Sequence, residues 1–192
     1  MTIVRLGALL FALTLPVAAQ TTTATQSTDV SPQVDPARVY GNMIRTAEKD
    51  IVSLAEAMPE DKYSFAPATD LFRTGQSTEF KGVRTFAQQV AHVASSNYEF
   101  LQAMGLEKDK DFAAIEKLTT KAEALQALKD SFAAAEKAAA TITPQNAFEG
   151  LGPKKTGTRA GMASAIAWHS MDHYGQLVVY ARMNGIVPPQ SR

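Results

Sequence analysis

The feature that most restricts the fold of this chain is the spacing of its apolar residues. Apolar side chains recur at three- and four-residue steps in four stretches, at about 36–57, 83–104, 119–142 and 158–183. That spacing places them on one face of an α-helix, whereas a half-buried strand would alternate every second residue. No stretch shows a competing strand pattern. The sequence therefore predicts an all-α fold, a four-helix bundle.

The first of these helices shows the pattern most clearly. Asp35 is suited to the N-cap and Pro36 to the first helical position, and Pro59 ends the helix. Its predicted buried stripe consists of Tyr40, Met43, Ala47, Ile51, Leu54 and Met58. About 25 residues with little periodicity follow before the second helix. A connection of this length predicts a crossover between the first two helices, which would leave them parallel rather than antiparallel, and periodicity alone does not decide the handedness.

Glycine and proline mark the ends of the other helices. Gly105 follows the second helix, and Gly185 with Pro188 follows the fourth, as expected for residues that cap or stop a helix. A loop rich in glycine, proline and lysine, residues 146–157, separates the third helix from the fourth. We therefore expect the bundle domain to span residues 36–189.

The first residues have the order of a secretory signal peptide. Arg5 supplies a positive charge, and the apolar run 6–15 is too short to cross a bilayer comfortably. Val17 and Ala19 then provide small residues at positions −3 and −1 of a cleavage site before Gln20. This pattern predicts a signal peptide over residues 1–19 and an exported protein, either periplasmic or secreted. The alternative is a buried N-terminal helix.

The composition narrows the classes of function. Apolar residues make up 45% of the chain and charged residues 20%, as in an ordinary globular domain, while residues 20–35 form a Thr/Ser/Gln-rich spacer expected to be disordered. A formal net charge of zero argues against a nucleic-acid partner. The absence of cysteine excludes disulfides, a thiol nucleophile and a lipid-bearing cysteine at the cleavage site. We therefore expect no stable membrane anchor after cleavage.

Two of the three histidines in the chain form the strongest local motif. His169 and His173 are four residues apart, so they lie one above the other on a helix, about 40° apart around it. One metal ion could reach both imidazoles. Met162, Ile166 and Tyr180 share their face, so we expect the pair to point inward. The alternative is two partly buried histidines with ordinary hydrogen-bond partners.

The third histidine, His92, lies in the predicted second helix. It is roughly 120° from the centre of that helix's apolar stripe. Its neighbours on that side are the polar residues Gln88, Gln89, Ser96 and Glu99. The helical wheel thus favours a surface histidine, unless this polar side lines a cleft against the fourth helix. In that case three imidazoles with one open position would form the arrangement of a catalytic zinc site.

Other side chains near the histidines are weaker candidates. Gln176 could contact a ligand or make a hydrogen bond between helices. Asp172 could orient an imidazole, although a solvated acid is the simpler interpretation. Glu99 is expected to be a surface charge, Trp168 to be part of the core, and the lysines of the 146–157 loop to be solvated.

Two stretches carry a resemblance to a known family. Val83 to Ala94, which contains His92, resembles the second helix of the DinB-like superfamily, together with the Asn-Tyr pair that follows. The run His-Ser-Met-Asp-His-Tyr-Gly-Gln-Leu at 169–177 resembles its fourth helix, and the Arg, Gly and Pro-Pro that follow fit as well. Tyr174 stands where arginine is common in that family. The segment 58–67 is also similar, so the resemblance covers most of residues 37–189.

The resemblance implies a four-helix bundle that holds a divalent metal ion through His92, His169 and His173. Zinc is the metal expected first, with nickel, iron or manganese as alternatives. The family resemblance also implies that the protein forms a homodimer. Relatives include thiol-dependent transferases and an isomerase. We expect a metal-dependent hydrolase or transferase acting on a small molecule, with a non-catalytic metal or small-ligand binder as the alternative. No catalytic side chain can be assigned, because cysteine is absent and every histidine would be a ligand.

Overall fold

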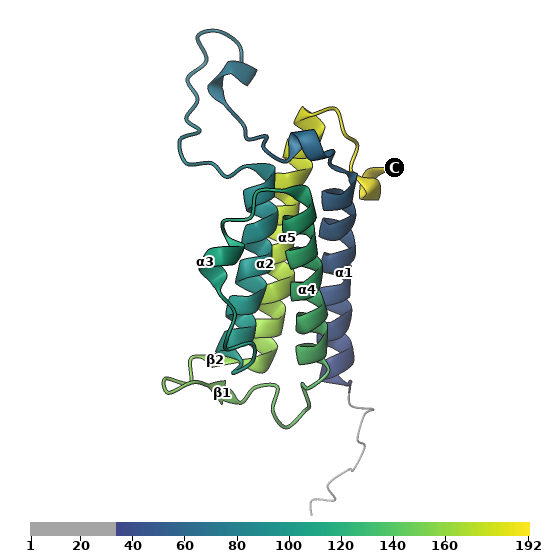
Figure 1. Cartoon of the computed structure of the whole chain (residues 1–192). Coiled ribbons are helices and arrows are strands. Elements are labelled where there is room, and N and C mark those ends of the chain that lie inside the picture. Colours follow the sequence, from purple (N-terminus) through teal and green to yellow (C-terminus); the bar gives the residue numbers. More distant parts are fainter. Residues whose placement is uncertain (1–33) are drawn as a thin grey trace, which may run out of the picture. The chain divides into compact units, whose positions relative to one another are not determined.

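The computed structural model describes residues 34–192. The predicted signal peptide and residues 20–33 of the predicted spacer lie outside the described residues. Four long helices form a bundle, as Figure 1 shows: α1 (Pro36–Ala57), α2 (Phe86–Ala103), α4 (Lys121–Ala139) and α5 (Arg159–Met183). The predicted all-α four-helix bundle is confirmed, and the predicted helix ranges agree with these bounds to within three residues.

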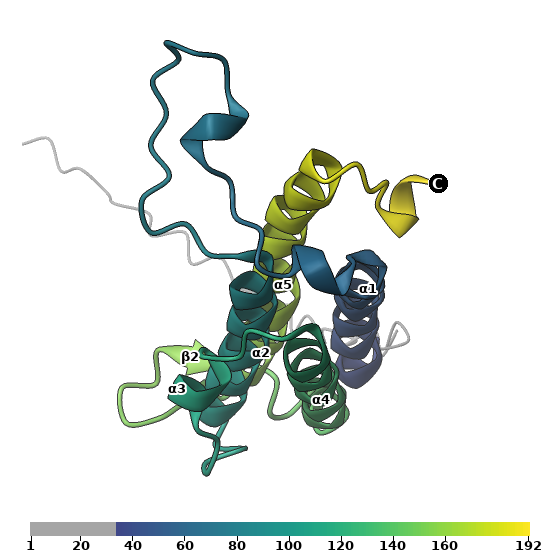
Figure 2. The ribbon, with the colours of Figure 1, turned by 45° about the horizontal axis from the view of Figure 1, so that its top comes forward.

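The four helices occupy the corners of the bundle. Both α1 and α2 pack against α4 and against α5, so α1 and α2 lie at opposite corners (Figures 1 and 2). The start of α2 lies beside the end of α1, because the backbone N–H of Ala87 donates to the carbonyl of Tyr63 at 2.9 Å. The connection 58–85 therefore crosses one end of the bundle between opposite corners, and the helices it joins run antiparallel. The parallel arrangement expected from a crossover between them is wrong, because the connection stays at the end of the bundle where α1 finishes.

The segment that returns along the bundle is the connection from α2 to α4. It carries the short helix α3 (Phe112–Ile115) back beside α2, so that α2 and α4 run parallel while α1 and α5 run the other way (Figure 1). The apolar periodicity did not predict α3. Phe112, Ile115 and Leu118 pack against the core and hold this segment on the side of α2.

The remaining elements are short. The 3-10 turns are η1 (Glu60–Lys62), η2 (Thr69–Leu71) and η3 (Pro189–Ser191). The loop between α4 and α5 contains a two-stranded antiparallel hairpin, β1 (Gly150–Leu151) with β2 (Gly157–Thr158), in which Gly150 pairs with Thr158. No helix within residues 34–192 is long and apolar enough to cross a bilayer.

Local capping explains where the helices begin and end. The side chain of Asp35 accepts from the N–H of Ala37 at 3.0 Å, and proline follows at the first helical position, as predicted for α1. Thr85 and Gln88 form a reciprocal capping box at the start of α2. Gly105 ends α2 in a left-handed conformation, with φ +84°, where a residue with a Cβ would be strained.

Two expectations about the core are wrong. In α1 the predicted stripe is displaced at one position: Met43 is 40% exposed, and its neighbour Ile44 is fully buried. Trp168, expected in the core, is 62% exposed. It stands two residues from both Ile166 and Ser170, which are buried, so it lies on the opposite side of α5.

The second helix is buried on most of its circumference, which matters for the site. Twelve of the 18 residues of α2 are buried. They include the polar residues Gln89, Ser95, Ser96 and Asn97. The reason is that α2 packs against α3, α4 and α5 at once. A polar side of this helix is therefore not the same as a solvent-facing side.

Candidate metal centre

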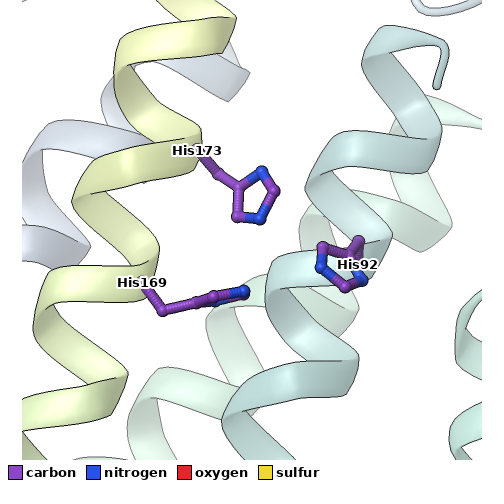
Figure 3. Close-up of side chains that lie close together, drawn as sticks. All are labelled: His92, His169 and His173. Atoms are coloured by element: carbon purple, nitrogen blue, oxygen red, sulfur yellow. The ribbon is translucent and has the colours of Figure 1, made fainter. Parts of the chain in front are cut away.

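The three histidines of the chain meet between α2 and α5. Figure 3 shows the rings of His169 and His173, one turn apart on α5, facing the ring of His92 on α2. Each ring offers a nitrogen, and these nitrogens all lie within 4.8 Å of one another. The ring centroid of His92 lies 5.3 Å from that of His169 and 4.8 Å from that of His173. The ring centroids of His169 and His173 are 4.6 Å apart. The inward orientation predicted for the α5 pair is confirmed.

The position of His92 corrects the surface interpretation given by the helical wheel. His92 lies away from the apolar stripe of α2, but that side of α2 is covered by α5 and α3. Its side chain retains only 19% exposure. The polar residues around it do line an interface with the last helix, which was the condition for a three-histidine site.

Burial keeps two of the imidazoles uncharged. Burial is the largest cause of a shift that lowers the pKa of His173 to about 4, and the neighbouring His169 and His92 contribute to that shift because a second positive charge there would be repelled. The pKa of His169 is also lowered, first by burial and then by His92, while the carboxylate of Asp172 acts in the opposite direction. Both rings are therefore neutral at pH 7, and neutral imidazole is the form that binds metal ions.

The second nitrogen of each ring has a different environment. His92 Nδ1 lies 2.7 Å from Oε1 of Glu116, the residue that follows α3. By contrast, the Nδ1 atoms of His169 and His173 are buried and have no hydrogen-bond partner among residues 34–192. Glu116 was not predicted from the sequence. It lies 24 residues from His92 in a segment without periodicity, and no local motif connects the two.

The donor set fits a metal ion. Buried polar atoms without partners are uncommon and costly, and two of them occur within this one cluster. An imidazole nitrogen binds zinc at about 2.0–2.1 Å, so two such nitrogens on one ion can be at most about 4.2 Å apart. The nitrogens of the cluster, all within 4.8 Å of one another, lie close to that limit. Three neutral nitrogen ligands suit zinc and other late first-row divalent ions.

A hydrogen-bonded chain joins the two helices beside the cluster. Gln89 Nε2 of α2 donates to Gln176 Oε1 of α5 at 2.8 Å, and Gln176 Nε2 donates to Asp172 Oδ2 at 3.0 Å. Gln176 thus makes the bond between helices that was one of its two predicted interpretations. Asp172 is exposed and contacts Gln176, so its carboxylate does not orient an imidazole through these bonds.

The surroundings of the cluster are part apolar and part open. The ring of Phe100 packs edge-on against His169, with centroids 5.7 Å apart. A cavity of about 330 Å³, lined by Gly82, Val83, Arg84, Gln88 and Glu116, adjoins the cluster through Glu116. Glu99 is exposed, as expected for a surface charge, and the hairpin-loop lysines are exposed as well.

The fold and the cluster together define a four-helix bundle with a buried three-histidine site that could hold a metal ion. The model of the DinB superfamily matches residues 43–177, which include all three histidines, and the chain belongs to that superfamily. The resemblance inferred from the motifs is therefore confirmed. No curated protein matches the sequence.

Proposed function

We propose that this protein binds one divalent metal ion through His92, His169 and His173 and uses it in hydrolysis or group transfer on a small molecule. The observation that carries the proposal is the meeting of all three histidines in one cluster between two helices. Zinc is the first candidate, with nickel, iron or manganese as alternatives. Membership of the DinB superfamily supports the same ligand set.

The chemistry follows from the charge of the ligands. Three neutral imidazoles leave a divalent ion with its full charge, and such an ion polarises carbonyl groups and lowers the pKa of water. The protein's part is to keep the imidazoles unprotonated, which burial does for His169 and His173. Two familiar competing nucleophiles are not offered here, because the sequence contains no cysteine and Ser170 beside His169 is fully buried.

Metal analysis tests the proposal most directly. Protein purified through a tag without histidine should contain about one ion per chain, and a variant with all three histidines replaced by alanine should contain none. Zinc titration of the metal-free protein checks the same stoichiometry. A folded wild-type protein that neither retains nor binds a divalent ion would refute the proposed site.

Activity separates an enzyme from a binder. Candidate small esters, amides and electrophiles with a thiol donor would be screened with the metal-loaded protein. Any activity should vanish with a chelator, return when metal is added back, and resist serine-directed covalent inhibitors. Activity that survives verified metal removal would contradict the mechanism. A protein that binds metal tightly and turns over no substrate would favour the non-catalytic alternative.

We also propose that the protein acts outside the cytoplasm, on the basis of the residue pattern in 1–19. Cleavage before Gln20 predicts a mature chain that starts with that residue. Intact mass of the protein recovered from the extracytoplasmic fraction checks this. A mass that still includes residues 1–19 in that fraction would contradict the proposed cleavage.

A further inference from the structure

The carboxylate of Glu116 reaches the cluster from a part of the chain that contributes no metal ligand. Glu116 follows α3, in the connection between α2 and α4. Its Oε1 lies 2.7 Å from His92 Nδ1, and both side chains are partly buried, with 35% exposure for Glu116 and 19% for His92. This distance is that of a strong hydrogen bond to a charged acceptor.

We propose that Glu116 is a positioning residue that accepts the Nδ1 proton of His92 and directs Nε2 of that ring toward the metal. This inference rests on the proposed metal site. A neutral imidazole carries one proton, and a fixed partner on one nitrogen determines which nitrogen is free to bind. A carboxylate partner also makes the ligating nitrogen more basic and restricts rotation of the ring.

The segment that carries Glu116 is held in place by its own contacts. Asp111 caps α3, since its side chain accepts from the N–H of Ala114 at 3.0 Å. Phe112 and Ile115 then pack against the core of the bundle. The carboxylate is thus presented by a short anchored turn, which restricts where it can place the imidazole of His92.

His92 is the ligand for which such help matters most. His169 and His173 share one helix, so their relative position is set by a single helical turn. His92 comes from a different helix and must be aligned with them across an interface. It is also the ring for which the structure shows a partner on Nδ1, because the Nδ1 atoms of the α5 pair have none among the described residues.

The first test measures zinc affinity by competition with a chelator in Glu116→Ala and Glu116→Gln. Removing such a partner typically weakens metal binding by about 10- to 100-fold, and we expect a loss of this size for Glu116→Ala. We expect a smaller loss for Glu116→Gln, because the amide oxygen can still accept the Nδ1 proton. The stoichiometry should remain that of the wild type. Glu99→Gln, an exposed glutamate on the same helix as His92, is the matched control and should bind as the wild type does.

The second test needs no metal. Nitrogen NMR of the metal-free protein at pH 8, where an ordinary imidazole is neutral, reports which ring nitrogen carries the proton. We expect His92 to be protonated at Nδ1 in the wild type and in Glu116→Gln, and the Nε2-protonated form to increase in Glu116→Ala. Circular dichroism of each variant establishes that the bundle is folded.

Three results would overturn the inference. The first is unchanged zinc affinity in folded Glu116→Ala. The second is loss of the bound ion in Glu116→Ala as complete as in His92→Ala, which would make Glu116 a ligand. The third is a wild-type His92 protonated at Nε2. If the wild-type protein binds no zinc but His92 carries its proton at Nδ1, the proposed function fails while the hydrogen bond to Glu116 stands.

Discussion

Two interfaces of the bundle partly bury titratable side chains, and burial shifts the pKa values of these side chains in opposite directions. Between α2 and α5 it lowers the pKa of His173 to about 4, aided by the two neighbouring histidines. Between α1 and α4 it raises the pKa of Glu48 to about 7, aided by a hydrogen bond to Glu136 and by its negative charge. In both places the low-polarity surroundings disfavour the charged form.

The neutral form of each side chain determines what its interface can bind. An imidazole that loses its charge gains a free lone pair, so three of them together form a set of neutral donors for a cation. A carboxyl group that loses its charge holds a proton, which it can share with a second carboxylate. The histidine interface is therefore suited to a metal ion. At the glutamate interface, by contrast, a proton shared between Glu48 and Glu136 takes the place of a bound cation. The following predictions test this contrast.

The largest effect is expected for the histidines on α5. His169→Ala or His173→Ala should weaken zinc binding by more than about 100-fold, because each variant removes one of the two imidazole ligands that a single turn of α5 supplies. Isothermal titration at pH 7.5 measures the change, and binding should also be lost at low pH as the imidazoles protonate. Met171→Ala, at an exposed position between the two, is the control and should leave affinity unchanged. Full affinity in either histidine variant would show that the cluster does not bind metal as proposed.

His92→Ala tests whether the second helix takes part. It should remove most of the bound zinc and lower the affinity by about 100-fold or more, since the ion would keep two ligands from one helix and lose the third. The same titration and metal analysis measure it, and thermal unfolding establishes that the variant is folded. A variant with full stoichiometry and affinity would leave a two-histidine site on α5 and return His92 to a structural role.

The glutamate interface should respond to pH and not to metal. The folded-state pKa of Glu48 is raised to about 7, from an ordinary value of 4.5. Its contribution to stability is therefore present below about pH 4.5 and is lost as the pH rises through 7. Glu48→Gln should be more stable than the wild type at pH 8 and no more stable at pH 4, as measured by urea unfolding, with unchanged zinc affinity. Glu60→Gln, an exposed change, is the control, and equal stability differences at both pH values would contradict the interpretation.

The smallest effect is expected for the chain of hydrogen bonds beside the cluster. Gln89→Met removes the donor to Gln176 while keeping a side chain of similar length. It should lower the free energy of unfolding by about 1 kcal/mol, the usual net value of one hydrogen bond, and change zinc affinity by less than about threefold. Gln190→Met, at an exposed position, is the control. A large loss of metal binding in Gln89→Met would place Gln89 in the site itself.

Much of this molecule follows from the chain by itself. Helical periodicity and capping depend on residues a few positions apart, so the bounds of α1, the cap at Asp35 and the stop at Gly105 could be predicted locally. The same holds for His169 and His173, whose alignment is a property of one helical turn. The exposed Trp168 shows the limit of composition, since a large aromatic side chain is not buried when its helix turns it outward.

Tertiary structure decided the rest of the site. The polar side of α2 predicts a surface when that helix is considered alone, but α5 and α3 cover it, so His92 faces α5 and not solvent. Glu116 becomes its partner only because the connection after α2 folds back along that helix. Helical periodicity describes one helix and its near neighbours in sequence. Which helix covers which side, and what an aperiodic segment brings to it, depends on packing between parts of the chain that no local spacing relates.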